Sequence, residues 1–260
     1  MLLAIDAGNT NIVFAVCDDD KVKHSWRCQS SASRSADEYA AWLLPLLAHN
    51  ALSLKDISDV IISSVVPGAN MNLQQFCGTY VGHRPFWVRT GEAAMQLETL
   101  VDKPEEVGAD RLVNAIAVNK HYKPPAVVLD FGTATTFDVI DANGCYLGGV
   151  IAPGPNLSLN ALHSAAAKLP KVSIRKPPGI IGRNTVHAME AGMYWGYVGL
   201  IEGTISRIAH QLDTAPRVIA TGGLARIFES DLPSLTHIDD DLTLKGLIEL
   251  YKTLSEDGSQ

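Results

Sequence analysis

Short apolar runs separated by polar turns occupy the start of the chain. Residues 3–5 and 12–16 are apolar and flank a polar, glycine-bearing turn at 6–11. A second turn at 18–21 leads into another run at 22–28. Apolar runs of this length, bounded by turn residues, predict β-strands. The chain is therefore expected to open with three consecutive strands.

Helical spacing follows the opening strands. Apolar residues recur every three or four positions over 35–50, 71–80 and 108–121, which predicts three helices. Shorter apolar runs at 60–66 and 86–88 predict two further strands among them. This mixture predicts an α/β unit with a mixed sheet flanked by helices.

The opening pattern recurs in residues 126–151, with its polar turn at 130–136, after a Lys-Pro-Pro sequence. The acidic residues that end the first strand of each set, Asp6 and Asp130, are 124 positions apart (130 − 6), almost half the chain. A repeat of two long units indicates a duplicated domain rather than a solenoid. We therefore expect an N-terminal half at 1–123 and a C-terminal half at 124–260.

The second half is richer in helical patterns. Helices are predicted at 156–168, 185–212 and 242–254, with a last strand at 217–223. Glycine inside a helix costs about 1 kcal/mol relative to alanine, so several glycines in one helix predict close approach by another backbone. Either a neighbouring helix of the same chain or a second subunit satisfies that expectation. The long helix carries four such residues: Gly192, Gly196, Gly199 and Gly203.

Composition narrows the possible functions. The 260 residues carry 21 Lys and Arg against 28 Asp and Glu, a net charge of −7, without a basic run. Such a chain is a poor non-specific binder of nucleic acid or of an anionic membrane. It has no apolar run of the roughly 18 residues that a membrane span needs, and its first residues lack the basic region of a signal peptide. Four cysteines without metal-ligand spacing are expected to be reduced thiols, which favours a cytoplasmic protein.

The two related turns suggest phosphate binding. Each places an aspartate at a strand end, followed by a glycine and small hydroxyl residues, so backbone N–H groups can approach an anion. The strand-end carboxylate can hold Mg²⁺, directly or through water. One such turn is more often an ordinary hairpin, but two of them can bind phosphates from both sides. A third glycine-rich turn at 221–224 follows a late strand, where a nucleoside can lie close to the backbone.

This arrangement resembles the actin, hexokinase and Hsp70-like ATPase superfamily, and in detail it is most similar to the type III pantothenate kinase family. The Gly-Ala-Asp-Arg sequence at 108–111 is the most discriminating match. The resemblance implies two duplicated ribonuclease-H-like domains with mixed sheets flanked by helices, separated by an interdomain cleft. The matching segments run in order along the chain: 6–11, 107–115, 130–136, 148–154, 182–185 and 221–223.

The resemblance also implies an activity. It is the ATP-dependent phosphorylation of pantothenate to 4′-phosphopantothenate, the first step of coenzyme A biosynthesis. Asp110 matches the general base, and a carboxylate suits the removal of a proton from an alcohol. The alternative for Asp110 is a helix N-cap, because an apolar helix follows it. Arg111 matches a substrate-binding position, and a guanidinium suits the carboxylate of pantothenate.

The resemblance assigns the remaining positions by their match to family motifs. Asp6 lies near Mg²⁺, which it holds directly or through water, and Asp130 binds a monovalent cation, K⁺ or NH₄⁺. The ATP-binding positions are Asp6, Ala7, Gly8, Asn9, Thr10, Asn11, Ile12, Val13, Thr133, Gly222 and Gly223. The substrate-binding positions are Gly108, Ala109, Asp110, Arg111, Thr185 and Val101. Val101 is a departure, since many family members have a tyrosine there.

Implied partners are ATP, pantothenate and a second copy of the chain, because in the family a homodimer shares the substrate site. Two alternatives stay open at this stage. A non-catalytic regulatory member of the same fold would not need to keep Asp6, Asp110 and Asp130 near a polyphosphate. A phosphatase of the same superfamily would use water as acceptor, and the Gly-Ala-Asp-Arg segment disfavours it.

Overall fold

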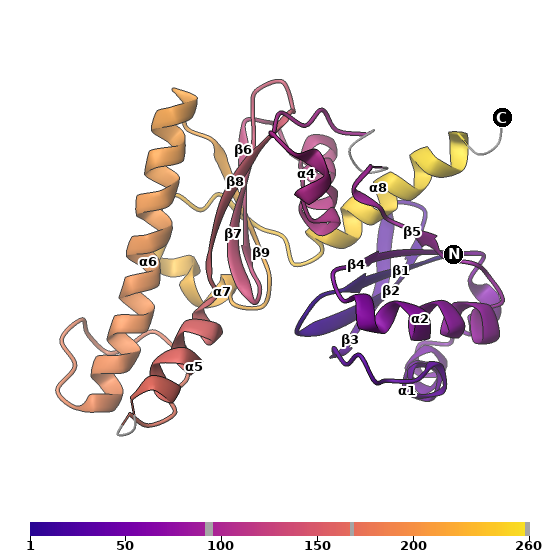
Figure 1. Cartoon of the computed structure of the whole chain (residues 1–260), viewed down its shortest axis with the longest axis horizontal. Coiled ribbons are helices and arrows are strands. Elements are labelled where there is room, and N and C mark those ends of the chain that lie inside the picture. The colour runs from indigo at the N-terminus through magenta and orange to yellow at the C-terminus, as the bar shows by residue number, and fades with distance from the viewer. Residues whose placement is uncertain (92–95, 167–168, 258–260) are drawn as a thin grey trace. The chain divides into compact units, whose positions relative to one another are not determined.

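Two compact units make up the chain. The computed structural model describes residues 1–91, 96–166 and 169–257 (Figure 1). Unit 1 comprises Met1–Tyr122 with Asp241–Gln260, and unit 2 comprises Lys123–Asp240. The sequence-based division placed residues 241–260 in the second half, whereas the structure places them in unit 1. The reason is a close helix contact, because a Cβ on Gly246 would lie 2.1 Å from the carbonyl oxygen of Val113.

Unit 1 is built on a mixed five-stranded sheet with the order β3-β2-β1-β4-β5. The first three strands are antiparallel neighbours, whereas β4 and β5 run parallel to β1. The strands are β1 (Leu2–Ala7), β2 (Asn11–Asp18), β3 (Lys21–Gln29), β4 (Asp59–Ser64) and β5 (Phe86–Trp87). The helices are α1 (Ala36–His49), α2 (Pro67–Phe76), α4 (Ala109–His121) and α8 (Leu242–Asp257), with short turns at Leu54–Asp56, Cys77–Val81 and Pro104–Glu106.

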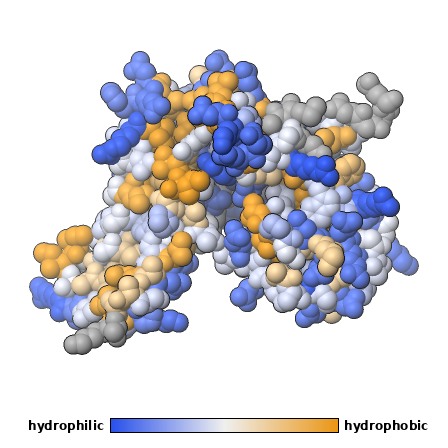
Figure 2. Space-filling view, in the orientation of Figure 1, coloured by the Kyte–Doolittle hydropathy of each residue, from blue (hydrophilic) through white to orange (hydrophobic). Residues whose placement is uncertain are grey.

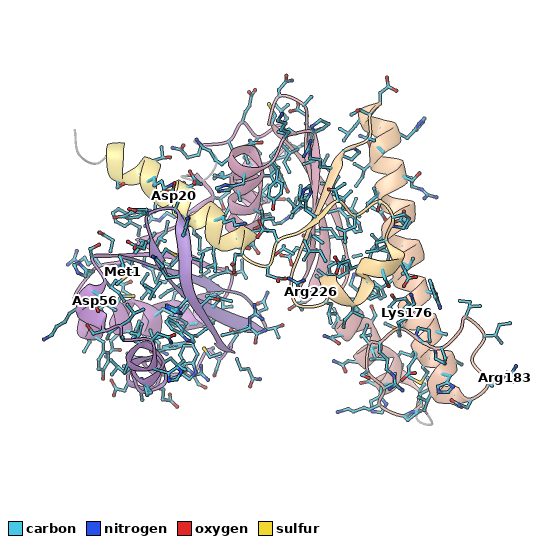
Figure 3. All side chains as sticks on the ribbon, turned by 180° about the vertical axis from the view of Figure 1, so that it is seen from behind. Met1, Asp20, Asp56, Lys176, Arg183 and Arg226 are labelled. Atoms are coloured by element: carbon cyan, nitrogen blue, oxygen red, sulfur yellow. The ribbon has the colours of Figure 1, made fainter. Side chains whose placement is uncertain are left out.

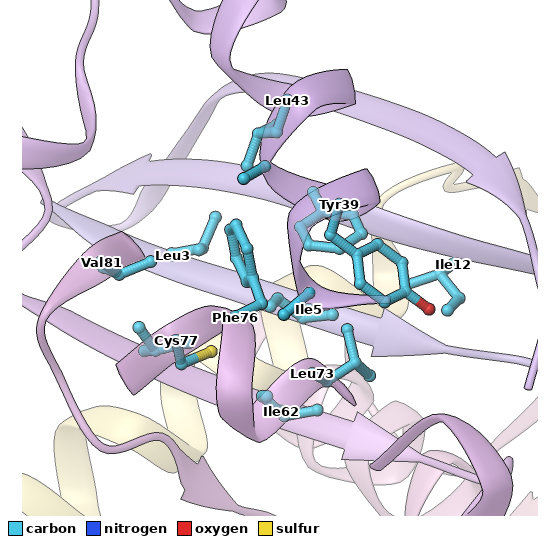
Figure 4. Close-up of a cluster of buried hydrophobic side chains, with 14 of the residues drawn as sticks. Leu3, Ile5, Ile12, Tyr39, Leu43, Ile62, Leu73, Phe76, Cys77 and Val81 are labelled. Carbon is cyan, nitrogen blue, oxygen red and sulfur yellow. The ribbon is translucent and has the colours of Figure 1, made fainter. Parts of the chain in front are cut away.

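Alternate residues of these strands build the core beneath α1 and α2. Leu3 and Ile5 of β1 face this core and are fully buried (Figure 4). The Phe14 ring lies 5.7 Å from the Tyr39 ring and 5.9 Å from the Phe76 ring, measured between centroids. Because successive side chains alternate between the faces of a strand, Ala4 and Asp6 lie on the opposite face of β1.

Two helices of unit 1 show how local sequence sets their ends. Ser35 caps α1, accepting from the Glu38 N–H at 3.3 Å while the Glu38 carboxylate accepts from the Ser35 N–H at 2.8 Å. The helix predicted at 71–80 begins earlier, at Pro67, and its regular part ends at Phe76. Proline suits the first helical position because its fixed φ is already helical and its missing N–H would have no partner there.

Unit 2 repeats this topology. Its sheet has the order β10-β9-β6-β7-β8, with β7 antiparallel to both β6 and β8, while β9 is parallel to β6 and β10 is parallel to β9. The strands are β6 (Ala126–Phe131), β7 (Ala134–Ile140), β8 (Tyr146–Pro153), β9 (Arg217–Thr221) and β10 (His237–Ile238). The helices are α5 (Pro155–Ala165), α6 (Thr185–Leu212) and α7 (Ala225–Phe228), followed by a short turn at Glu229–Asp231. The helix predicted at 156–168 ends at Ala165, and positions 167–168 lie outside the described residues.

The core of unit 2 lies between its sheet and α6, which runs the length of the unit (Figure 1). The rings of Phe131 and Tyr194 both stack on Phe228, with centroids 5.4 and 5.2 Å away. All four cysteines of the chain are buried and form no disulfide.

The duplication extends to single positions. β1 and β6 have six residues each and the same burial pattern, with only the fifth residue partly exposed. That fifth residue is Asp6 in one strand and Asp130 in the other. The predicted fold class, two α/β domains with mixed sheets flanked by helices, is confirmed.

Candidate functional site

The first predicted phosphate turn closes the β1–β2 hairpin of unit 1. The Gly8 N–H donates to the Asn11 carbonyl at 3.0 Å, and the Ser30 N–H donates to the Thr10 carbonyl at 2.9 Å. Asn9 and Thr10 are exposed beyond the end of the sheet, and Asp6 is partly exposed just before them. The turn therefore presents small polar groups that can contact a phosphate, next to one carboxylate that suits a cation bound with it.

Not every predicted position of this segment offers a side chain to a ligand. Ala7 and Ile12 are fully buried in the core of unit 1, so only their backbones face the turn. Val13 is partly exposed and pairs with Asp6 across the hairpin.

The second predicted turn closes the β6–β7 hairpin of unit 2. The Gly132 N–H donates to the Ala134 carbonyl at 3.0 Å. Behind the turn, the Gly154 N–H donates to the Thr133 carbonyl at 3.0 Å. A Cβ on Gly154 would lie 2.4 Å from the Thr133 carbonyl oxygen and 2.6 Å from that of Gly132, so only glycine fits this contact. Gly154 thus supports the exposed Thr133 from behind.

The third turn, at the end of β9, lies against the same corner of unit 2. Gly222 has a φ of +89°, which favours glycine, and its Cβ position would be 2.8 Å from a carboxylate oxygen of Asp130. Gly223 is exposed, and a Cβ there would meet no atom within 4 Å. The structure therefore brings Asp130, Thr133 and Gly222 to one corner, as the predicted nucleotide site requires.

Asp110 lies in the first turn of α4. The helix N-cap is Gly108, which disagrees with the alternative that Asp110 is the N-cap. The Asp110 carboxylate accepts from the backbone N–H of Arg111 at 2.9 Å. Burial is the larger influence on its acidity and raises the pKa of Asp110, against the opposing effects of Arg111. A carboxylate with a raised pKa is a better proton acceptor, which suits a general base.

Thr185 lies apart from the second turn within unit 2. It is the first residue of α6, after Asn184, whose side chain accepts from the His187 N–H at 2.9 Å. The second turn is linked to α6 at a position far from Thr185. There the Tyr197 hydroxyl donates to the carbonyl of Pro153, just before Gly154, at 2.6 Å. At about 1.5 Å per residue, the twelve positions from 185 to 197 span roughly 18 Å of helix.

Thr185 instead borders an apolar hollow of about 480 Å³, together with Leu162, Leu169, Ala188, Met189, Gly192 and Met193. Two ion pairs connect the segment that precedes Thr185 to other parts of unit 2. Arg175 pairs with the buried Glu190 at 2.8 Å, and Lys176 pairs with Asp231 at 2.6 Å. Figure 3 shows Lys176 at α6 and Arg183 pointing outward further along this segment.

Val101 lies in a bend of unit 1, before α4, and is partly exposed. The sequence does not place a tyrosine there, so its side chain offers an apolar contact without a hydrogen bond.

Metal ligands are sparse in the described part of the chain. Residues 1–91, 96–166 and 169–257 contain no cluster of three or more His, Cys, Asp or Glu side chains suited to a metal ion. A divalent ion would therefore need phosphate oxygens and water as further ligands, which is the usual environment of nucleotide-bound Mg²⁺. Over the same residues, none of the helices combines the length and apolar character of a membrane span.

The chain matches the model of the type III pantothenate kinase family over residues 2–207. The type III pantothenate kinase of Paramagnetospirillum magneticum is 53% identical over 252 residues, covering 97% of each chain. The chain belongs to the type III pantothenate kinase family.

Solved structures of other proteins share the fold of this chain. A protein from Campylobacter jejuni described as a Baf family transcriptional activator has a TM-score of 0.63 at 18% identity, covering 98% of this chain and 99% of its own. A protein from Sinorhizobium meliloti described as a 2-dehydro-3-deoxygalactonokinase has a TM-score of 0.57 at 13% identity, with 98% and 97% covered. At these identities the likeness concerns the fold alone.

Two residues that lie beside the predicted site residues are missing from the sequence-based set. Gly154 supports the second turn, and the signal for it is a glycine between two prolines directly after a strand. Ser63 is the residue of β4 in register with Asp6. Its signal is a pair of serines that ends an otherwise apolar buried strand.

Proposed function

We propose that this chain transfers the γ-phosphoryl group of ATP to the primary hydroxyl of pantothenate, giving 4′-phosphopantothenate in the first step of coenzyme A biosynthesis. The observation that carries the proposal is family membership along most of the chain, together with the retention of Asp6, Asp110 and Asp130. A non-catalytic regulator would have no need for all three carboxylates, so that alternative is not favoured.

The proposed chemistry starts at the acceptor alcohol. The Asp110 carboxylate takes the hydroxyl proton while the new P–O bond forms and the bond from the γ-phosphorus to the ADP oxygen breaks. The raised pKa of Asp110 supports this role, because a carboxylate with a higher pKa accepts the hydroxyl proton more readily. Arg111 is proposed to bind the pantothenate carboxylate, with Gly108, Ala109 and Val101 around it.

The two turns are proposed to bind phosphates of one nucleotide. Exposed backbone and hydroxyl groups of 8–11 and Thr133 contact the phosphate oxygens, and Gly222 and Gly223 leave room for the adenosine. Mg²⁺ bound with the nucleotide neutralises charge on the phosphate oxygens. Asp6 fits such an ion, since it is a partly exposed carboxylate oxygen ligand beside the turn. Asp130 is proposed to hold K⁺ or NH₄⁺.

A homodimer with a shared substrate site is part of the proposal. On α6 the core-facing residues recur at 190, 194, 197, 201, 205 and 208, and the glycines lie on the other side. A Cβ on Gly192, Gly196 or Gly199 would meet no atom within 4 Å, so packing inside the described chain does not explain them. Figure 2 shows apolar surface over the β8 edge of unit 2, where Ile151 is 63% exposed. We infer that these surfaces pack against a second copy, which brings Thr185 to the partner's substrate.

The test is an assay of ADP release by the purified chain with ATP, Mg²⁺ and K⁺, with and without pantothenate. The proposal predicts release that depends on pantothenate. ADP release at the same rate without pantothenate would contradict it and favour a phosphatase.

A further inference from the structure

One buried hydroxyl lies beside the strand-end carboxylate of unit 1. Ser63 of β4 is in register with Asp6 of β1, and the two strands are parallel. Neighbouring strands lie about 4.8 Å apart, and residues in register point to the same face. Val60 and Ile62 face the core beneath α1 and α2, so Ser63 faces the opposite side together with Asp6.

The Ser63 side chain is fully buried, and its hydroxyl has no hydrogen-bond partner among the described residues. Burying a hydroxyl without a partner is unfavourable, and buried polar groups in folded proteins are nearly always bonded. The neighbouring hydroxyl of Ser64, on the other face, donates to the Asn70 side chain at 2.6 Å. Of the two neighbouring serines of β4, only Ser63, on the face that carries Asp6, has an unbonded hydroxyl.

The strand of Ser63, β4, is also connected to the segment that carries Asp110. The Val88 N–H donates to the carbonyl of Ile62, directly before Ser63, at 2.8 Å. Two residues further, the Thr90 hydroxyl donates to the Val107 carbonyl at 3.0 Å. Val107 immediately precedes Gly108, the N-cap of α4. Two hydrogen bonds, one of them donated by a side-chain hydroxyl, thus connect the strand of Ser63 with the segment that carries Asp110, all within unit 1.

Unit 2 keeps a hydroxyl at the equivalent position. Thr221 of β9 is in register with Asp130 of β6, as Ser63 is with Asp6, and it is also buried. Strand ends that only filled a core would not need a hydroxyl beside the acid in both halves.

We propose that Ser63 is a positioning residue for the magnesium–nucleotide complex, whose hydroxyl and the Asp6 carboxylate hold the same magnesium-bound water. Mg²⁺ keeps several of its waters in proteins, and groups beyond its direct ligands orient them. The proposal rests on the proposed function and adds a residue that touches neither the phosphates nor pantothenate.

The test measures binding of a non-hydrolysable ATP analogue, AMP-PNP, by titration calorimetry, once with Mg²⁺ and once with EDTA. Ser63→Ala is expected to weaken binding about tenfold with Mg²⁺, the effect of one hydrogen bond to a charged group, and to have no effect in EDTA. Ser63→Thr retains the hydroxyl and is expected to restore most of the lost affinity. The melting temperature of Ser63→Ala without nucleotide is expected to be unchanged or higher, because the variant loses an unbonded buried hydroxyl.

Tyr39→Phe is the matched control. Tyr39 is in the same unit, fully buried, and its hydroxyl also lacks a partner among the described residues, but it faces the core on the other side of the sheet. Its removal is expected to leave AMP-PNP binding unchanged.

Three results would overturn the role of Ser63: wild-type affinity in Ser63→Ala, an equal loss with Mg²⁺ and with EDTA, or the same loss in Tyr39→Phe. Failure of the unaltered protein to bind AMP-PNP with Mg²⁺ would instead remove the proposed function, and this inference with it.

Discussion

The second phosphate turn depends on the absence of one side chain behind it. Replacing Gly154 by alanine would place a Cβ 2.4 Å from the Thr133 carbonyl oxygen and 2.6 Å from that of Gly132, where ordinary contacts begin near 3.4 Å. The turn or the start of α5 must therefore move by about 1 Å (3.4 − 2.4). The backbone of Gly154, with φ −69° and ψ 158°, suits alanine, so the clash alone is tested.

The size of the effect follows from two opposing contributions. Overpacking against the backbone costs about 1–3 kcal/mol, and alanine returns about 0.4–1 kcal/mol by restricting the unfolded chain. A net loss of about 1–2 kcal/mol lowers the melting temperature by roughly 2–8 °C in a chain of this size. A misplacement of about 1 Å near the reacting groups can reduce turnover roughly 100-fold. We therefore expect a modest change in stability and a large change in activity.

The measurement combines thermal unfolding with ADP release at saturating pantothenate. Gly179→Ala is the control, because a Cβ there meets no atom within 4 Å and the residue is exposed in the same unit. It is expected to keep both the melting temperature and the turnover. If Gly154→Ala unfolds at a lower temperature but keeps wild-type turnover and affinity for ATP, the turn at 132–133 does not contact the phosphates.

Further predictions concern Asp110, the cation and the dimer. Asp110→Asn is expected to lose about 10²–10⁴ in turnover and to keep its affinity for ATP; near-normal turnover removes Asp110 from the chemistry. Because burial raises the pKa of Asp110, its ionised form disfavours folding, so stability from this group falls as pH rises above the ordinary value of 3.8. Asp110→Asn is therefore expected to unfold at a higher temperature than the unaltered chain at pH 7. This difference is expected to fade as the pH falls to the ordinary pKa of 3.8. The same difference at both pH values would refute burial of the Asp110 charge as its cause. Turnover is expected to need K⁺ or NH₄⁺, and equal rates in sodium-only buffer would contradict the role of Asp130. Gly196→Leu is expected to give a monomer with little activity in sedimentation and ADP-release measurements, and an active monomer would contradict the shared site.

The sequence predicted the parts of the fold that depend on local patterns. Apolar runs and turn residues located nine of the ten strands among the described residues, and the repeat that places Asp6 and Asp130 at equivalent positions. It did not predict β10, which has only two residues. Nor did it predict that α8 packs in unit 1, because the contact between Gly246 and Val113 joins residues 133 positions apart (246 − 113).

The candidate site was predictable where a motif carried it. The turns at 6–11 and 130–136 have a local signature, and so does Gly-Ala-Asp-Arg. Ser63 and Gly154 have only weak local signals, since their importance comes from strand register and from a carbonyl brought close by folding. Thr185 shows the same limit, because its distance from the second turn within unit 2 depends on the length of α6.

The central claim is that two strand-end aspartates and a third carboxylate serve one reaction. A crystal structure of the chain with AMP-PNP, Mg²⁺, K⁺ and pantothenate tests it most directly. We predict that the turns at Asp6 and Asp130 contact the same triphosphate and that an Asp110 oxygen lies within about 2.6–3.2 Å of the pantothenate primary hydroxyl. A triphosphate that touches only one of the turns, or an Asp110 carboxylate out of reach of that hydroxyl, would contradict the account.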